Sequence, residues 1–293
     1  MRTWYLLGIF GVFGCDGEDA AATSDAGPDA SPPVDAAPPT EPPAPLAPTE
    51  HALVITELRF SDVISPGVAP GFDLDGVDGA CGHPDQVGPD GTPGVDNQLA
   101  TLMPVFRATE ARAIDGLLQE SVNGGMVLYV AHLTGLDGWL DDSEVALHLQ
   151  GAAGPKPYLT TEGLIEPDQT FVYDPESPAN LSTGVLEAGT FTSAPFDVGL
   201  PVRILNVDFI MQISLGRVQL TLHPDGSADG VFGGAVAVET IVELANGVDT
   251  SVRELATNLL RQKADLMPDE SGRCTAISVW WQFHAERAFV ADW

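Results

Sequence analysis

The stretch Leu205–Leu222 reads LNVDFIMQISLGRVQLTL, and its pattern is the strongest indication of the fold class. Up to Leu215 all odd-numbered residues are apolar and most even-numbered residues are polar. This period of two is typical of a β-strand with one buried face. After Gly216 the apolar residues stand at even numbers as far as Leu222. A glycine at such a switch predicts a β-bulge or a tight turn.

The same alternation recurs on both sides of this stretch. His223–Gly230, HPDGSADG, has the composition of a hairpin turn and leads into a predicted strand at Val231–Val238. Ile277–Ala285 alternates again, which places Trp281 on one face and Trp280 on the other. The remaining predicted strands are Ala52–Phe60, Met126–Leu133, Glu144–Gln150, Gln169–Asp174, Gly184–Phe191 and Val198–Arg203.

Three segments have the period of an amphipathic helix. Ser251–Leu266 has apolar residues on one face, a capping box formed by Ser251 and Glu254, and Pro268 just beyond its end. The other two predicted helices are Val238–Asn246 and Thr109–Ser121. Many strands with few helices predict a mainly β fold, which we interpret as a β-sandwich or jelly-roll-like domain with two or three helical insertions.

The charge of the chain limits its partners. The 293 residues carry 42 acidic and 12 basic side chains, a formal net charge of −30. Such a surface repels phosphates, so nucleic acid is excluded as an expected partner. The same charge repels itself in the folded state, and bound cations would therefore stabilise the fold.

The first residues, MRTWYLLGIFGVFG, have the composition of a signal peptide. A positive start at Arg2 precedes an apolar run, Trp4–Phe13, that is too short to span a bilayer. The run ends in Val12-Phe13-Gly14-Cys15, which resembles the lipobox of bacterial lipoproteins although Phe13 is bulkier than usual there. The resemblance implies that Cys15 is lipidated. The alternative is an ordinary signal peptide or a short uncleaved anchor, with Cys15 incidental.

Residues 16–50 are rich in proline, alanine and acidic residues and contain no base. Such a segment cannot bury enough apolar surface to fold, and its prolines favour an extended chain. We therefore predict a signal peptide at 1–14, a disordered tether at 15–50 and a single β-rich domain at 51–293. This architecture resembles uncharacterised bacterial surface lipoproteins. It implies export, a lipid anchor at the bacterial outer membrane or cell surface, and no particular activity.

Two cysteines remain for the folded domain, Cys81 and Cys274. An exported compartment permits a disulfide, and we predict that the two are joined. The alternative is a pair of free thiols.

The segment Gly71–Asn97, GFDLDGVDGACGHPDQVGPDGTPGVDN, is acidic, glycine-rich and without a base. Carboxylates and backbone carbonyls are the ligands of Ca²⁺, and a loop of this length is usually functional or disordered. A Cys81–Cys274 bridge would bring a second acidic segment close. The sequence predicts a structural calcium site of non-EF-hand geometry, with solvated acids as the equal alternative. The candidate ligands are Asp73, Asp75, Asp78, Asp85, Asp269 and Glu270.

Two smaller clusters have simpler interpretations. Asp137, Asp141 and Asp142 could bind a second ion, but a hairpin tip explains them better. His132 and His148 lie on adjacent predicted strands and are expected to form a structural pair rather than a metal site.

Candidate ligand-binding residues lie on the last strand. Trp280, Gln282 and His284 share a face, and an exposed aromatic beside polar groups can stack on a sugar or anchor a protein partner. The alternative is that this face is covered, for example by the helix predicted at 251–266. No motif of a nucleophile elbow, a P-loop or an HExxH zinc site occurs, so no catalytic residue is assigned.

These observations lead to one principal expectation about function. We expect an exported, lipid-anchored protein whose calcium-stabilised β-rich domain does binding or structural work at the cell surface, on a carbohydrate or protein ligand. The alternative is a secreted hydrolase that uses carboxylates on a polymer such as a polysaccharide. The sequence leaves open whether the protein is an enzyme.

Overall fold

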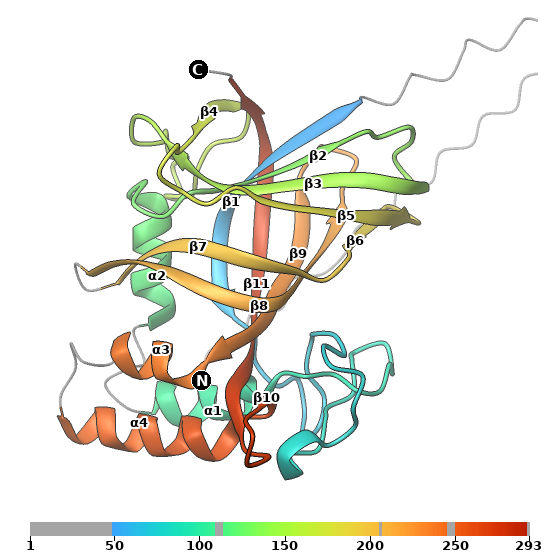
Figure 1. The fold of residues 1–293 in the computed structure, drawn as a ribbon. Helices are drawn as coiled ribbons and strands as arrows, with labels where there is room; N and C mark the ends of the chain where they lie inside the picture. Colours follow the sequence, from blue (N-terminus) through green and yellow to red (C-terminus); the bar gives the residue numbers. More distant parts are fainter. Residues whose placement is uncertain (1–48, 109–113, 205–206, 245–249, 292–293) are drawn as a thin grey trace, which may run out of the picture. The chain divides into compact units, whose positions relative to one another are not determined.

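The computed structural model describes residues 49–108, 114–204, 207–244 and 250–291. At their centre is an antiparallel β-barrel of eight strands, closed where the last strand pairs with the first (Figure 1). In order around the barrel these strands are β1 (Glu50–Phe60), β2 (Tyr129–Thr134), β3 (Asp142–Ala153), β5 (Asn180–Glu187), β6 (Thr190–Ser193), β8 (Val207–Leu222), β9 (Ala228–Ala237) and β11 (Cys274–Val290).

The prediction of a mainly β fold is confirmed, but the β-sandwich or jelly-roll interpretation is wrong. A single sheet closes on itself because β11 pairs with β9 on one side and with β1 on the other. A closed sheet has the same alternation of buried and exposed residues as a sandwich, so the pattern alone could not separate the two.

Three further strands extend this sheet. β4 (Gln169–Tyr173) runs parallel to the end of β11 and also pairs with β3. β7 (Phe196–Ile204) pairs with the first half of β8, and β10 (Leu266–Pro268) with the start of β11.

From Val207 onward, the stretch quoted first forms one long strand, β8, with the predicted bulge, while residues 205–206 lie outside the described ranges. The register between β8 and β9 shifts between Ser214 and Arg217, and Leu215 has a φ of 55°. A Cβ atom on Gly216 would lie 2.7 Å from Cγ2 of Val198 on β7. The glycine is therefore needed for close packing of the two strands as well as for the bulge.

The predicted strand Gly184–Phe191 is in fact a hairpin. β5 ends at Glu187 and β6 begins at Thr190, with Ala188 and Gly189 at φ values of 49° and 79°. Positive φ at both central residues is the conformation of the tight two-residue turn that suits twisted strands.

Large apolar side chains fill the barrel. Trp281 and Phe283 of β11, Phe232 of β9 and Phe191 of β6 are all at most 6% exposed. The ring of Phe283 lies over Gly230, where a Cβ atom would be 2.3 Å from its Cζ. A barrel of eight strands has an interior just wide enough to be filled by side chains, and the interior of this barrel is filled in that way.

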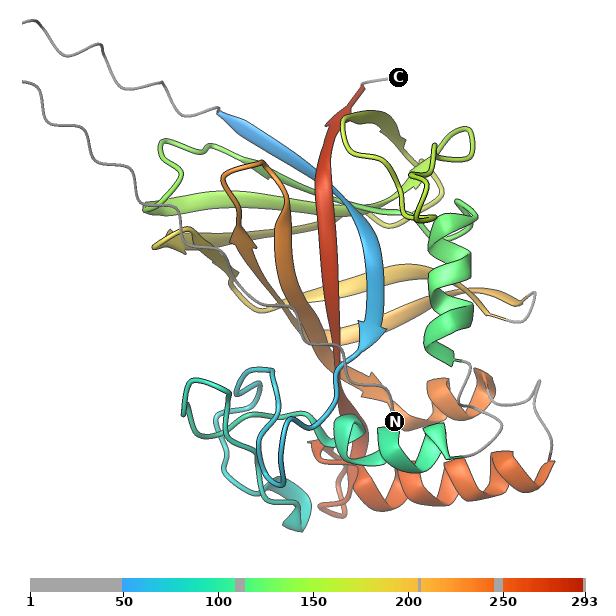
Figure 2. The same cartoon turned by 180° about the vertical axis from the view of Figure 1, so that it is seen from behind.

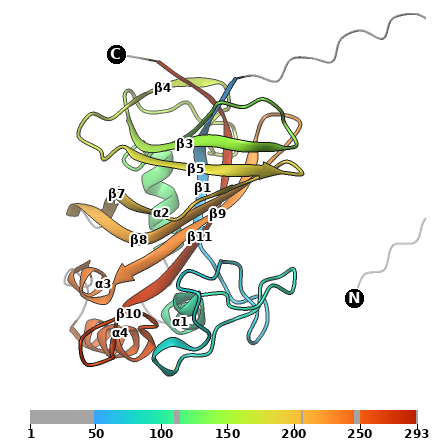
Figure 3. The ribbon, with the colours of Figure 1, turned by 45° about the vertical axis from the view of Figure 1, so that its right-hand side comes forward.

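Three helices lie near one end of the barrel: α1 (Gln98–Arg107), α3 (Val238–Leu244) and α4 (Thr250–Lys263) (Figures 1 and 3). The helices predicted at Val238–Asn246 and Ser251–Leu266 correspond to α3 and α4, while the capping-box side chain of Ser251 lies outside the described side chains. None of the helices in the described ranges is long and apolar enough to cross a membrane.

The helix α1 was not among the helices predicted from the sequence. Its buried side chains Leu99, Leu102 and Met103 have helical spacing, and Asn97 caps its first turn by accepting a hydrogen bond from the Ala100 N–H at 3.3 Å. The helical spacing was not recognised because Pro104 lies inside the helix and the acidic loop directly precedes the helix.

The helix α2 (Ile114–Asn123) takes the place of a strand beside the second half of β1 (Figure 2). Pairing with β2 ends at Val54, and beyond it the amide of Gln119 accepts from the Leu58 N–H at 3.2 Å and donates to the Thr56 carbonyl at 2.7 Å. The Gln119 side chain therefore satisfies backbone N–H and carbonyl groups of β1 that have no neighbouring strand. The prediction of a helix at Thr109–Ser121 is confirmed from residue 114 onward; residues 109–113 lie outside the described ranges.

Candidate functional site

The acidic segment lies in a long loop, residues 61–97, between β1 and α1, with one short 3-10 turn, η1 (Ala80–Gly82). The loop is beside the lower part of β11, at the end of the barrel where the three helices lie (Figures 1 and 3). Buried amides organise it: Asn97 Nδ2 donates to the Pro70 carbonyl at 2.7 Å, and Gln86 Nε2 donates to the Asn97 carbonyl at 2.6 Å. It is an ordered element with its own polar core.

A disulfide joins this loop to the barrel, as predicted. Cys81 of η1 is bonded to Cys274, the first residue of β11, with 6.0 Å between the Cα atoms. The two cysteines are 193 residues apart, so the bond fixes the loop to the far end of the chain.

The loop covers Trp280, which corrects the prediction that this residue binds a ligand. Trp280 is 1% exposed, its ring lies 5.2 Å from that of Phe72, and its Nε1 donates to the Asp96 carbonyl at 2.5 Å. On the barrel side the indole rests on Gly233, where a Cβ would be 2.5 Å from Cδ2. The alternative of a covered face thus holds at Trp280, where the cover is the acidic loop and not the helix at 251–266, whereas Gln282 and His284 on the same face are partly exposed.

Three aspartates of the loop form the candidate metal site. Asp73, Asp75 and Asp96 each offer one carboxylate oxygen, and these oxygens lie within 4.8 Å of one another. One oxygen of each carboxylate accepts a backbone N–H from residues 74–77 at 2.6–2.8 Å. Among the described residues, no hydrogen bond reaches the other oxygen of any of the three. The group could therefore hold a metal ion with side chains that are already positioned.

Asp96 is the unusual member of this group. It is 3% exposed, and burial raises its pKa to about 7, against the hydrogen bond from Leu74 that lowers it. The charged neighbours that act on it are all carboxylates, Asp75, Asp265 and Asp85, and each raises its pKa further. A buried carboxylate among other carboxylates needs either a proton or a cation.

A second buried carboxylate lies behind the loop. Asp265, between α4 and β10, is 3% exposed, and burial raises its pKa to about 6. Its oxygens accept from the Ser278 N–H at 2.8 Å and from the Ser278 hydroxyl at 2.6 Å. Ser278 in turn accepts from the Gln98 N–H at 2.7 Å, so this network connects α1, β11 and the end of α4.

The other predicted metal ligands lie outside the group of three. Asp85 is influenced by the group through its charge. Burial raises the pKa of Asp85, and the carboxylates of Asp78, Asp75 and Asp73 raise it further. A hydrogen bond from the Gly79 N–H, at 3.3 Å, acts in the opposite direction. Asp78 is exposed.

The second acidic segment is likewise not part of the group. Asp269 belongs to a tight turn in which hydrogen bonds from Ser271 and Arg273 lower its pKa to about 2, and Glu270 is exposed. The disulfide brings this turn to the same end of the barrel but not to the site.

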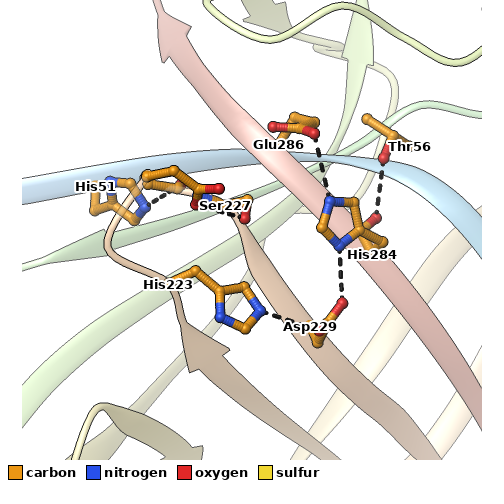
Figure 4. Close-up of polar contacts among 9 residues, drawn as sticks. His51, Thr56, His223, Ser227, Asp229, His284 and Glu286 are labelled. Atoms are coloured by element: carbon orange, nitrogen blue, oxygen red, sulfur yellow. Dashed lines mark hydrogen bonds and ion pairs between the residues drawn. The ribbon is translucent and has the colours of Figure 1, made fainter. Parts of the chain in front are cut away.

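The predicted ligand residue His284 belongs to a polar chain on the outer face of β9 and β11 (Figure 4). Asp229 accepts from two imidazoles, from His284 Nδ1 at 2.8 Å and from His223 Nε2 at 3.0 Å. His284 Nε2 lies 3.4 Å from Glu286. Burial lowers the pKa of His284, but the hydrogen bonds to Asp229 and Glu286 outweigh it and raise the pKa overall. Gln282, on the same face, is partly exposed.

The two smaller clusters have structural roles. At the hairpin between β2 and β3, Asp142 accepts from the N–H groups of Asp137 and Glu144, and Asp141 accepts from the Ala188 N–H. These bonds are those of a hairpin tip, the interpretation that the sequence favoured.

His132 and His148 are direct cross-strand neighbours on β2 and β3, as predicted. Each has a hydrogen-bond partner of its own: His132 Nδ1 lies 3.0 Å from the hydroxyl of Tyr173, and His148 Nε2 lies 2.8 Å from Gln150 Oε1.

The chain matches no protein-family model, no curated protein and no solved structure. The function is therefore inferred from the geometry of the described residues. The predicted lipidation site Cys15, the signal peptide and most of the tether lie outside these residues.

Proposed function

We propose that this protein is exported and lipid-anchored through Cys15, and that calcium bound by Asp73, Asp75 and Asp96 stabilises its barrel domain for binding or structural work at the cell surface. The observation that supports this most directly is the convergence of three carboxylates, one of them buried.

Calcium suits this donor set better than other common ions. All three side chains offer oxygen, which favours hard cations over zinc or copper. Magnesium requires near-octahedral geometry and releases its water reluctantly, whereas calcium accepts six to eight oxygens in flexible arrangements. The glycine-rich loop allows backbone carbonyls and water to complete such a shell.

The role proposed for the ion is structural. Asp96 connects the site to the barrel, because its own carbonyl accepts the Trp280 indole N–H and its carboxylate accepts the Leu74 N–H. An ion that neutralises Asp96 would therefore fix the loop over the β9–β11 face.

Calorimetric titration of the metal-free full chain with CaCl₂ tests this part of the proposal. We expect one site, lost in Asp96→Asn and Asp73→Asn and retained in Asp78→Asn, an exposed aspartate of the same loop. Absence of calcium binding, or equal losses in all three variants, would contradict it. Mass spectrometry of the mature protein tests the anchor: a diacyl- or triacyl-modified Cys15 is expected, and an unmodified N-terminus at another residue would exclude it.

The alternative of a carboxylate-dependent hydrolase has no supporting observation among the described residues. Its signature would be two facing carboxylates in a cleft. The carboxylates whose pKa is most raised, those of Asp96 and Asp265, are each only 3% exposed and do not line a cleft among the described residues.

A further inference from the structure

A groove of about 630 Å³ lies on the outer wall of the barrel, away from the metal loop. Its lining residues belong to β2, β3 and β5 and to the segment from Ala194 to Phe196, where β6 passes into β7. The register places His132, His148 and Leu181 side by side on three consecutive strands, and Leu181 is 67% exposed. The neighbouring residues Leu133 and Leu147 are buried, as expected for the opposite face.

The groove wall carries few charged groups on a strongly acidic protein. Among the described residues that line it, none is an aspartate, glutamate, lysine or arginine, although the chain has a net charge of −30. One carboxylate, that of Glu50, lies 3.5 Å from Nε2 of the lining residue His132. The wall therefore offers a ligand hydrogen bonds and apolar contact rather than a fixed positive charge. A cation would bind better elsewhere on this surface, and a polyanion would be repelled by the surface around the groove.

Hydrogen bonds select one tautomer of the neutral His148 side chain and leave its other ring nitrogen as an acceptor. Gln150 is 7% exposed, and its Nε2 donates to the carbonyls of Asp174 and Ser177. Its Oε1 must then face His148 and can only accept, so His148 Nε2 carries a proton. In the neutral imidazole, Nδ1 is consequently a bare acceptor, and it has no hydrogen-bond partner among the described residues.

The hydroxyl groups of the groove add to this acceptor character. Ser182 donates to the carbonyls of Thr183 and Ala194 at 3.2 and 3.1 Å, so its lone pairs remain available. The hydroxyls of Thr134 and Thr183 have no hydrogen bond to any described residue and can rotate to meet a ligand. The fitting ligand is thus one with many O–H donors.

Apolar groups provide the rest of the wall. Among the lining residues, Leu181 and Pro195 are exposed and Phe196 is partly exposed. A sugar ring has this combination of hydroxyl groups at its edge and C–H groups on its face. An extended peptide fits less well, because β5 already has strand partners on both sides and offers no free edge for pairing.

We propose that this groove binds a neutral oligosaccharide. His148 Nδ1 and the hydroxyls of Thr134, Ser182 and Thr183 accept and exchange hydrogen bonds with the sugar hydroxyls. Leu181 and Phe196 pack against a ring face. The imidazole is held in position by Gln150 and by stacking on Tyr173, whose ring centroid is 4.3 Å away. This inference goes beyond the calcium-stabilised loop and does not depend on it.

An array of neutral and acidic oligosaccharides, probed with the full chain in calcium, identifies the sugar, and calorimetry then measures its affinity. We expect binding to neutral members and at least about a tenfold loss of affinity in Leu181→Asp and in His148→Phe, which keeps a ring against Tyr173 but removes Nδ1. Leu255→Asp is the matched control, since Leu255 is 48% exposed on α4, and it should bind as the wild type does.

The proposal is overturned if no neutral oligosaccharide binds, if only acidic ones bind, or if Leu181→Asp binds as tightly as the wild type. Leu181 is a surface residue, so its variant reports on the groove even where His148→Phe fails to fold. Repeating the titration in EDTA separates the two sites. Binding that persists in EDTA supports the groove, and binding that is lost in Asp96→Asn but not in Leu181→Asp would assign the sugar to the metal loop instead.

Discussion

The barrel and the acidic loop of this protein are held together by opposite means. Inside the barrel, aromatic rings rest on glycines of neighbouring strands, as Phe283 does on Gly230. In the loop, carboxylates accept backbone N–H groups, and a disulfide and one covered tryptophan connect the loop to β11. The barrel should therefore withstand changes of ions and redox conditions, while the loop should respond to both.

The largest expected effect breaks the barrel without touching the loop. Phe283→Ala removes a ring that is 6% exposed and should cost about 3–5 kcal/mol of unfolding free energy, since truncating a buried aromatic leaves a cavity. Urea denaturation measures it. Phe289→Ala, at a 53% exposed phenylalanine on the same strand, should change stability little, and a comparable loss there would argue against this account of the core.

The next effect separates the loop from the barrel. The double variant Cys81→Ser, Cys274→Ser should lose about 2–4 kcal/mol, because the bond closes a loop of nearly the whole domain. Hydrogen exchange should increase within residues 61–97 more than in the barrel strands. Cys15→Ser serves as the control, and uniform exchange over the whole domain would show that the bond stabilises more than the loop.

Removal of calcium should have a somewhat smaller effect. At 100 times the dissociation constant an ion contributes about 2.7 kcal/mol, which corresponds to a melting shift of about 5–10 °C for a domain of this size. We expect EDTA to lower the melting temperature of the wild type by this amount and to leave that of Asp96→Asn unchanged. An equal EDTA effect in both proteins would place the ion elsewhere.

The smallest expected effect concerns pH and a region far from the loop. Because the pKa of His284 is raised on folding, its charged form stabilises the fold fully below the ordinary value of 6.5, and this stabilisation is lost as pH rises through the higher folded pKa. The pair with Asp229 is partly exposed, so the contribution should be below about 1 kcal/mol.

Denaturation curves at pH 5.5 and 8 measure this contribution. Asp229→Asn should reduce the difference between the two curves, whereas Asp197→Asn, at an exposed aspartate of β7, should not. Identical differences in both variants would assign the pH dependence to other groups.

The barrel and the loop also differ in how much of each could be predicted from the sequence. Alternation of apolar residues predicted most strands of the barrel and the bulge at Gly216, because period two reflects a local property of the backbone, but it merged β5 and β6 into one strand. Closure could not be predicted, since it depends on pairing between β1 and β11 at opposite ends of the chain.

For the loop, the sequence predicted a disulfide and a cation site, but it did not predict the full set of aspartates that converge there. Asp73 and Asp75 were among the candidates, whereas Asp96 was not, because its burial against Trp280 is a tertiary contact. A local signal was nevertheless present: Asp96, Asn97 and Gln98 stand directly before the apolar residues of α1, where a helix start predicts ordered polar groups.

The position of α2 along the second half of β1 has a consequence for self-association. A strand edge with free N–H and carbonyl groups is a template on which a second chain can add a strand and begin to aggregate. Along the second half of β1, the side chains of Gln119 and Asp115 occupy these groups. The helix α2 thus shields part of the first strand, where an exposed edge would invite polymerisation.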